Sequence, residues 1–397
     1  MYDVIVIGSG PSGLMSCIMA ASNNKKVLLL EKNAQLGKKL LLTGGGRCNL
    51  TNLKDVQKFI NEIPVNSKLL YSTLNNFGPL DIYNYFENLG VEMKIEDNDR
   101  VFPKADNSKV IVQALEAELN KKGVNIIYNC EVENIILEND YKKIISSKGN
   151  FETKKVIIAM GGASYPQTGS NGSGYKIAKS LNQPLTKLYP AETFLLLVDK
   201  LPLAGITLDE VEIILDKNVV DGSLLFTHSG LSGPATFKIS EYVYEKLKQE
   251  EFVNIKVNIL PNKNKEELLN DIKKYDQKKE IKTWIRKLMP NRLSDYILNF
   301  SGIDGSKKIA IISNKEKQLL IDNILTLPLR IKKTGSIEQS IVTGGGVDLK
   351  YINTKTMEST LNSGIYFVGE LLDFHGPTGG YNITIALSTG YTAGINI

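Results

Sequence analysis

The chain opens with the stretch Tyr2-Asp-Val-Ile-Val-Ile-Gly8-Ser-Gly10-Pro-Ser-Gly13, in which an apolar run leads into three glycines spaced G-x-G-x-x-G. Small and apolar residues follow at positions 14–21, and a second apolar run at positions 27–30 ends in Glu31. This pattern predicts a strand, a tight turn, a helix and a second strand with an acidic residue at its tip. The arrangement is the fingerprint of a dinucleotide-binding βαβ unit.

The residue types of this stretch each suit a dinucleotide. Gly8 lets the chain turn off the strand, Gly10 lets a pyrophosphate approach the backbone, and Gly13 lets the helix pack on the sheet. A helix that begins near Pro11 points free N–H groups and its positive dipole end at the phosphates. Glu31 lies 18 residues after Gly13 and can accept hydrogen bonds from a ribose hydroxyl. The alternative is an ordinary strand–helix turn with Glu31 as a solvated strand end.

Composition narrows the class of protein. The 397 residues predict two or three domains, and the formal net charge is +5. Lysines are scattered or mixed with acids, as in residues 263–287, which favours a solvated surface over a nucleic-acid groove. No apolar run reaches the roughly 18 residues of a membrane span. Because the first strand begins at residue 2, it leaves no room for a signal peptide, so we expect a cytoplasmic protein without a membrane partner.

Cysteine and histidine are sparse. Cys17, Cys48 and Cys130 are far apart in the sequence and form no C-x-x-C pair, which argues against a disulfide framework and a dithiol relay. His228 and His375 are the only histidines. With so few of these ligands we expect no metal site.

Two further glycine-rich segments indicate ligand contacts. Residues 43–52, Thr-Gly-Gly-Gly-Arg-Cys-Asn-Leu-Thr-Asn, do not suit the interior of a helix or strand, so we interpret them as a loop that lies against a ligand. The alternative is a plain flexible loop. The apolar run at residues 156–160 ends in glycines, which is typical of the carboxyl edge of a sheet where ligands bind.

The order of predicted strands, glycine turns and helices along the sequence predicts a discontinuous first domain. Residues 191–344 show short alternating strands, which indicate an inserted, β-barrel-like substrate domain with a helical appendage at about 262–325. Residues 345–397 return to a strand–glycine–helix pattern, so we expect them to join residues 1–190 in one sheet. The fold class is therefore α/β, a discontinuous Rossmann-like domain with a β-rich insert.

Several segments together resemble a known family, the BaiN- or YhiN-like bacterial flavoproteins, which are NAD(P)/FAD-dependent or aminoacetone-oxidase-family enzymes. The matching segments are residues 8–13, 37–52 (GKKLLLTGGGRCNLTN), 102–104, 159–174 (AMGGASYPQTGSNGSG), 226–234 (FTHSGLSGP), 343–347 and 369–386 (GELLDFHGPTGGYNITIA). They span the whole chain. The sequence departs from the family pattern little, with Lys38 where arginine is frequent.

The resemblance implies an FAD-binding domain of the two-dinucleotide-binding-domain type. It implies that residues 8–13 hold the pyrophosphate, that Glu31 holds the adenosine ribose, and that residues 43–49 lie along the ribityl chain and flavin. The implied FAD-binding residues are Gly8, Gly10, Pro11, Ser12, Gly13, Glu31, Lys32, Gly37, Lys38, Lys39, Thr43, Gly44, Gly45, Arg47, Cys48, Asn49, Val132, Ala159, Gly161, Gly369, Glu370, Asp373, Gly379, Gly380, Tyr381 and Asn382.

A flavin would carry the chemistry, and the protein would orient it and adjust its electrostatics. Backbone N–H groups at residues 379–381 would stabilise negative charge at flavin N1/O2. Without C-x-x-C, we expect electrons to enter from NAD(P)H or from a reduced organic substrate. His375, His228 and Arg47 are the candidate catalytic residues, and either imidazole could move a proton near pH 7.

Two functions remain open at this point. The first is an FAD-dependent oxidoreductase that acts on a small organic molecule in the cleft between the FAD domain and the insert. The second is a flavin-binding sensor or binding protein with little turnover. An RNA-modifying flavoprotein is disfavoured by the modest, scattered positive charge.

Overall fold

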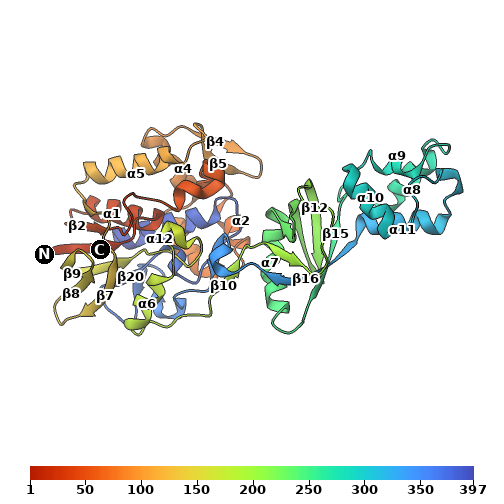
Figure 1. Cartoon of the computed structure of the whole chain (residues 1–397). Helices are drawn as coiled ribbons and strands as arrows, with labels where there is room; N and C mark the ends of the chain where they lie inside the picture. Colours follow the sequence, from red (N-terminus) through yellow and green to blue (C-terminus); the bar gives the residue numbers. More distant parts are fainter. The chain divides into compact units, whose positions relative to one another are not determined.

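The computed structural model describes residues 1–397, which fold into two compact units (Figure 1). Unit 1 comprises Met1–Ala191 and Ile337–Ile397, and unit 2 comprises Glu192–Ser336. The chain therefore leaves unit 1 once and returns to it.

The core of unit 1 is a sheet of nine strands. Its central part runs β20, β9, β1, β2, β6, and all neighbouring pairs in this part are parallel. The strands of the whole sheet are β1 (Tyr2–Ile7), β2 (Val27–Leu30), β6 (Asn125–Ile127), β7 (Val132–Leu137), β8 (Lys142–Ser146), β9 (Gly149–Ile158), β18 (Ile352–Asn353), β19 (Glu358–Ser359) and β20 (Ile365–Phe367). β2 is buried along its whole length, which suits a parallel strand covered on both faces.

Helices, a three-stranded sheet and one strand pair lie around this sheet. The helices are α1 (Pro11–Ser22), α2 (Val56–Asn61), α3 (Tyr71–Asn76), α4 (Pro79–Asn88), α5 (Lys109–Lys121), α6 (Ser173–Ser180) and α12 (Tyr381–Ile395). The smaller strands are β3 (Thr51–Asn52), β4 (Met93–Glu96), β5 (Arg100–Pro103), β10 (Tyr189–Ala191) and β17 (Val342–Gly344). The three-stranded sheet has the order β3, β5, β4. β10 pairs with β17 inside unit 1, although we expected residues 342–344 within the insert.

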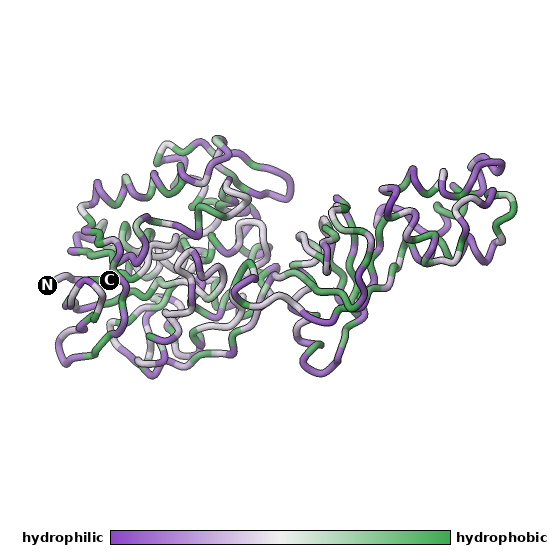
Figure 2. The backbone as a smooth tube through the Cα atoms, viewed as in Figure 1, coloured by the Kyte–Doolittle hydropathy of each residue, from purple (hydrophilic) through white to green (hydrophobic).

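The helix α5 shows how the sequence pattern places a helix on the core. It alternates hydrophilic and hydrophobic stretches in Figure 2, and Ile111, Val112, Leu115 and Leu119 are its buried residues. Their spacing of three and four residues puts them on one face, so the opposite face is left to solvent.

Helices from the two ends of the chain pack closely because their contact residues are small. The Ser16 hydroxyl on α1 donates to the backbone oxygen of Gly390 on α12 at 3.0 Å. A Cβ atom at Gly390 would lie 2.2 Å from the backbone oxygen of Ser12. This contact joins the C-terminal segment to the first βαβ unit.

Unit 2 is a closed six-stranded barrel with helices. The strand order is β11 (Leu195–Leu197), β14 (Gly230–Ser232), β13 (Asn218–Phe226), β12 (Thr207–Leu215), β15 (Val253–Asn258) and β16 (Leu327–Thr334). The helices are α7 (Pro234–Lys246), α8 (Lys265–Lys274), α9 (Ile281–Ile285), α10 (Asn291–Phe300) and α11 (Asn314–Leu325). The last four belong to residues 262–325, where we expected a helical appendage. The α/β class with a discontinuous Rossmann-type domain and a β-rich insert is confirmed.

Cys17, Cys48 and Cys130 are buried free thiols. None of the helices combines the length and apolar character that a membrane crossing requires.

Candidate functional site

The carboxyl ends of four parallel strands meet at one edge of the unit 1 sheet. The register pairs Ile7 of β1 with Leu30 of β2 and with Ile158 of β9, and Ile158 in turn with Phe367 of β20. The residues that immediately follow these ends are Gly8, Glu31, Ala159 and Val368. Segments far apart in the sequence are thereby brought to the edge where open α/β sheets bind ligands.

The three fingerprint glycines differ in what surrounds them. Gly8 has a φ of +98°, and a Cβ there would lie 2.5 Å from the backbone oxygen of Ala159. A Cβ at Gly13 would lie 1.9 Å from the backbone oxygen of Gly8. A Cβ at Gly10 would have no atom within 4 Å. Gly8 and Gly13 are therefore required by packing within the protein, whereas Gly10 borders open space at the start of α1, where a phosphate could bind.

Glu31 is buried at the end of β2 and ties two loops together. One carboxylate oxygen accepts hydrogen bonds from the Ser9 backbone N–H at 2.8 Å and from the Ser9 hydroxyl at 2.5 Å. The other accepts from the Asn33 backbone and side chain, both at 2.7 Å. Its backbone oxygen accepts from the Cys130 N–H at 2.9 Å, so the chain that enters β7 at Val132 passes beside it.

The segment after Glu31 stays close to the glycine turn. The Gly37 N–H donates to the backbone oxygen of Ser9 at 3.0 Å, and Gly37 has a φ of +61°. Lys32 and Lys38 are partly buried. Burial lowers the pKa of the Lys32 ammonium.

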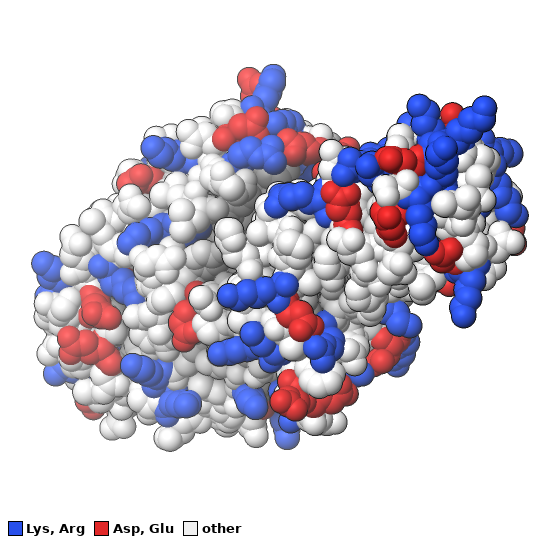
Figure 3. All heavy atoms as spheres, turned by 45° about the vertical axis from the view of Figure 1, so that its right-hand side comes forward, with Lys and Arg blue, Asp and Glu red and all other residues white.

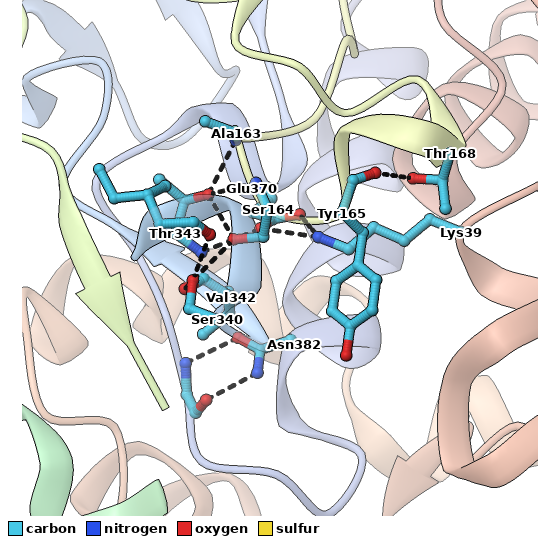
Figure 4. Close-up of polar contacts among 12 residues, drawn as sticks. Lys39, Ala163, Ser164, Tyr165, Thr168, Ser340, Val342, Thr343, Glu370 and Asn382 are labelled. Atoms are coloured by element: carbon cyan, nitrogen blue, oxygen red, sulfur yellow. Dashed lines mark hydrogen bonds and ion pairs between the residues drawn. The ribbon is translucent and has the colours of Figure 1, made fainter. Parts of the chain in front are cut away.

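Lys39 and Glu370 connect the two ends of the chain in space (Figure 4). The Lys39 ammonium lies 2.7 and 3.0 Å from the two carboxylate oxygens of Glu370. Glu370 also accepts from the Thr343 backbone N–H at 3.1 Å. The Tyr175 hydroxyl donates to the Glu370 backbone oxygen at 3.2 Å, and burial raises the pKa of Tyr175 well above its usual value. These contacts join the segment after β2, the strand β17, the helix α6 and the turn after β20.

Thr343 holds the glycine turn after β9. Its hydroxyl accepts from the backbone N–H groups of Ala163 at 2.8 Å and Ser164 at 3.1 Å, as Figure 4 shows. A Cβ at Gly162 would lie 2.5 Å from the same hydroxyl oxygen. The Ser164 hydroxyl lies 3.1 Å from that of Ser340. Thr343 was not predicted as a site residue, although it precedes the run Gly344–Gly346 and lies in the segment 343–347 that matches the family.

The loop at residues 43–49 contains consecutive left-handed residues. Gly44 and Gly45 have φ of +57° and +67°, and Gly45 has no atom within 4 Å of a Cβ position. Cys48 is also left-handed, with a φ of +62°, and burial raises the pKa of its thiol to about 12. The Cys48 thiol therefore stays protonated at neutral pH. The backbone of this loop borders open space at Gly45. Thr43 and Asn49 are partly buried at its two ends.

Arg47 is directed toward the antiparallel strands β4 and β5. Its guanidinium lies 2.8 Å from a carboxylate oxygen of Glu96 and 3.2 Å from one of Asp106, and 4.1 Å from the centre of the Phe102 ring. The hydrogen bond with Glu96 raises the pKa of Arg47. Glu96 and Asp106 neutralise the charge of the guanidinium. Arg47 could therefore bind a ligand or act in catalysis only while it keeps these two ion pairs or after it breaks them.

At the start of α12, side chains form hydrogen bonds within the protein, and the backbone N–H groups of the first turn face no acceptor inside the helix. The Tyr381 hydroxyl donates to Glu62 at 2.5 Å, and the Asn382 amide makes two hydrogen bonds with the Gly376 backbone, at 2.8 and 2.6 Å. Gly380 is left-handed, with a φ of +97°, and a Cβ there would lie 2.4 Å from Thr51. Because the first turn of a helix lacks internal acceptors, the backbone N–H groups are what this end offers to a ligand.

His375 and Asp373 lie in the loop between β20 and α12, whereas His228 does not. His375 is only 2 % exposed and meets the Tyr189 ring edge to face at 5.9 Å. Asp373 is partly buried, and burial raises the pKa of its carboxyl. His228 is exposed on the loop between β13 and β14 of unit 2. The structure thus places two of these three residues in the unit that carries the glycine turn.

The chain is similar to known proteins over its full length. A family model described as HI0933-like protein Rossmann domain matches residues 2–396. The chain is 32% identical to a ribosomal RNA dihydrouridine synthase of Haemophilus influenzae, covering 99% of this chain and 98% of that one. It is 30% identical to a 3-dehydro-bile acid delta(4,6)-reductase of Clostridium scindens, with the same coverage of 99% and 98%.

A solved structure shares the fold. The 3-ketosteroid-delta4-(5alpha)-dehydrogenase of Rhodococcus jostii has a TM-score of 0.54 at 13% identity and aligns over 100% of this chain and 96% of its own. At this identity the likeness concerns the fold alone. The match of nearly every residue to one family model carries the assignment: the chain belongs to the HI0933-like Rossmann family, as its resemblance to the BaiN- and YhiN-like flavoproteins implied.

Proposed function

We propose that this protein is an FAD-dependent oxidoreductase that reduces a carbon–carbon double bond conjugated to a carbonyl group. The observation that carries the proposal is the meeting of Gly8–Gly13, Glu31, the turn after β9 and the N-terminus of α12 at one edge of the unit 1 sheet. Full-length similarity to two proteins named as redox enzymes supports it and disfavours a sensor with little turnover.

The residues at this edge suit FAD. Open space at Gly10 accommodates a pyrophosphate at the positive end of α1. Glu31 stands at the tip of β2, where an acid accepts from an adenosine ribose, a group that FMN lacks. The loop at residues 43–49 and the start of α12 offer backbone N–H groups to the ribityl chain and the flavin. The other residues named above from the family resemblance, from Lys32 to Asn382, remain proposed contacts.

The reaction class comes from what the two relatives' names have in common. Dihydrouridine is uridine reduced at a ring double bond that is conjugated to a carbonyl, and the bile-acid name describes double bonds conjugated to a 3-oxo group. In both cases a hydride adds to the carbon remote from the carbonyl and a proton adds to the adjacent carbon. The hydride carries both electrons, so the hydride and one proton together complete the saturation.

FAD, when bound, would supply the hydride to the double bond. The chain supplies the surroundings: the backbone N–H groups of Gly379, Gly380 and Tyr381 would face the flavin pyrimidine edge and would favour negative charge there. His375 is the proposed donor of the proton from its imidazole N–H, because its loop leads directly into these groups. The Tyr175 hydroxyl donates a hydrogen bond to the Glu370 backbone oxygen and thereby positions that segment.

Anaerobic reduction of the purified protein tests the proposal. We expect a yellow protein that releases FAD on denaturation, whose flavin absorbance bleaches with NADH or NADPH. A cyclic enone or a uridine-containing RNA should then restore the absorbance and gain two hydrogens by mass spectrometry. A protein that binds FMN instead, or a reduced flavin that neither acceptor reoxidises, would contradict the proposal.

A further inference from the structure

The positive charge of this protein is concentrated in one segment of unit 2. Residues 262–325, here called the helical segment, contain 14 lysines and arginines against nine aspartates and glutamates. Since the whole chain has 48 basic and 43 acidic residues, the remainder is balanced, and the segment carries the entire net charge of +5. Figure 3 shows lysine and arginine side chains crowded over this part of the surface.

Few of these basic groups are neutralised by their neighbours. Four of the 14 form ion pairs, which are Lys265–Asp322, Lys282–Glu280, Arg286–Asp295 and Lys307–Glu316. Two acids of the segment form hydrogen bonds that stabilise its own fold instead of pairing with lysine or arginine. Asp271 accepts from the buried Trp284 indole at 2.8 Å, and Glu267 closes a capping box with Asn264 at the start of α8.

Folding gathers six of the remaining lysines at one end of the helical segment. Residues 277–281 run antiparallel to residues 307–310, with a bridge between Glu280 and Lys308. The Gln277 amide bonds to backbone oxygens at the end of α8, at 3.0 Å for Ile272, which brings that helix end beside the bridge. The ammonium of Lys287 lies 4.7 Å from the centre of the Tyr275 ring. The lysine cluster comprises Lys273, Lys274, Lys278, Lys279, Lys287 and Lys308, all exposed and without ion pairs.

We propose that the lysine cluster binds the phosphate backbone of an RNA substrate, and this inference rests on the proposed reduction of a conjugated double bond, here that of a uracil ring. Two acids lie among these segments: the Asp276 carboxylate accepts from the Lys278 backbone N–H at 2.9 Å, and Glu280 forms an ion pair with Lys282 at 2.8 Å. Six exposed ammonium groups on adjoining segments match a chain of regularly spaced phosphates, for which lysine is a point-charge binder. Tyr275 adds an aromatic ring on which a base can stack.

RNA is favoured over an acidic protein by the full-length relative named as a ribosomal RNA dihydrouridine synthase. Contacts to phosphate carry no sequence information, so the cluster would supply affinity and orientation, and the site of unit 1 would choose the base. The scattered appearance of these lysines in the sequence concealed the cluster, because residues 273–279 and 308 become neighbours only through the antiparallel bridge.

A pair of charge-matched variants tests the inference. The cluster variant replaces Lys273, Lys274, Lys278 and Lys279 by glutamine. The control variant replaces four exposed lysines elsewhere by glutamine, which are Lys148, Lys154, Lys332 and Lys333. Binding of a fluorescein-labelled ribosomal RNA hairpin is measured by anisotropy across a salt series. Thermal unfolding of both variants should match the parent, since all eight side chains are exposed.

We expect the cluster variant to bind the hairpin at least about tenfold more weakly near 0.1 M salt, and its slope of log affinity against log salt to flatten by about 3. The control variant should stay within about twofold of the parent. Equal losses in the two variants, or no binding by the parent, would overturn the inference. Binding of an acidic peptide in preference to the hairpin would overturn it as well.

The chemistry is followed separately, by reoxidation of the reduced flavin with a cyclic enone. Both variants should turn over this small acceptor at the parent's rate, because neither change touches unit 1 residues of the site. If the enone is reduced but the hairpin is not bound, the RNA inference fails and the reductase stands. If the hairpin binds through the cluster but no acceptor is reduced, the proposed reaction fails and the RNA-binding surface stands.

Discussion

The carboxylate of Glu31 accepts hydrogen bonds from both the backbone N–H and the hydroxyl of Ser9, at 2.8 and 2.5 Å. These bonds tie the tip of β2 to the middle of the glycine turn that follows β1. Glu31 is only 4 % exposed, so its carboxylate is stabilised mainly by these donors and by Asn33. The acid that we expect to hold a ribose is therefore also a structural part of the glycine turn.

Replacing this acid should weaken FAD binding. Glu31→Ala removes a charged hydrogen-bond acceptor, which typically costs on the order of 1.5–3 kcal/mol. Titration of the apoprotein with FAD measures the loss of affinity. The control is Ser9→Ala, which keeps the carboxylate and removes one donor to it, so its effect on FAD should be smaller. Unchanged FAD affinity in Glu31→Ala would refute the ribose role.

The fingerprint glycines should separate folding from ligand binding. Gly10→Ala places a methyl group in open space at an ordinary φ of −67°, so the apoprotein should fold normally but bind FAD poorly. Gly13→Ala places the same group 1.9 Å from the Gly8 oxygen and should destabilise the fold itself. Thermal unfolding of the apoproteins and FAD titration distinguish the two. A Gly10→Ala variant with parental FAD affinity would mean that the pyrophosphate lies elsewhere.

His375→Ala should retain FAD and slow a flavin half-reaction. General acid catalysis typically contributes about 10²–10⁴-fold, and the deficit should appear in the step that protonates the substrate. Stopped-flow reduction and reoxidation of the flavin-replete variant measure the two steps separately. Parental rates in both would remove His375 from the mechanism. Loss of flavin together with activity would instead assign the ring a packing role against Tyr189.

The raised pKa of Asp373 predicts a pH dependence of stability. Burial favours the protonated carboxyl in the folded state, so the folded protein binds this proton more tightly than the unfolded chain does. The stabilisation is complete below the ordinary carboxyl pKa of about 4 and is lost as the pH rises through the raised value. Asp373→Asn lacks this titration.

The thermal midpoint of Asp373→Asn minus that of the parent should therefore increase as the pH rises from about 3 to 7. Differential scanning fluorimetry across this range measures the difference. A difference that is constant with pH would show that burial does not control the protonation of Asp373. Lys148→Gln, a change at an exposed lysine, serves as the reference for effects of charge alone.

The local pattern of apolar and glycine residues in the sequence was enough to predict the central architecture of unit 1. The order of apolar run, glycine turn and apolar run at the start of the chain predicted β1, α1 and β2, and the same pattern near residue 369 predicted that the C-terminus joins their sheet. These signals are readable because strand burial, tight turns and helix packing depend on neighbouring residues.

The contacts within the site depended on the tertiary structure. Nothing near Lys39 in the sequence indicates that Glu370 faces it, and nothing near Thr343 indicates that its hydroxyl receives two N–H groups from the turn after β9. Tyr381 and Asn382 were expected to contact the cofactor, yet their side chains bond to Glu62 and Gly376, which leaves the backbone for a ligand.

The sequence by itself thus determined the strand, turn and helix that open the chain, the return of the C-terminal segment to their sheet, and that these build a Rossmann-type domain with an insert. Which side chains share a hydrogen bond was decided when the parallel strands of unit 1 aligned their loops, as for Lys39 and Glu370. Which lysines share a surface was decided by the antiparallel bridge between Glu280 and Lys308 in unit 2. Hydrogen bonds and charge interactions act over a few ångströms in space regardless of chain separation, so they follow from the packed sheet rather than from sequence neighbours.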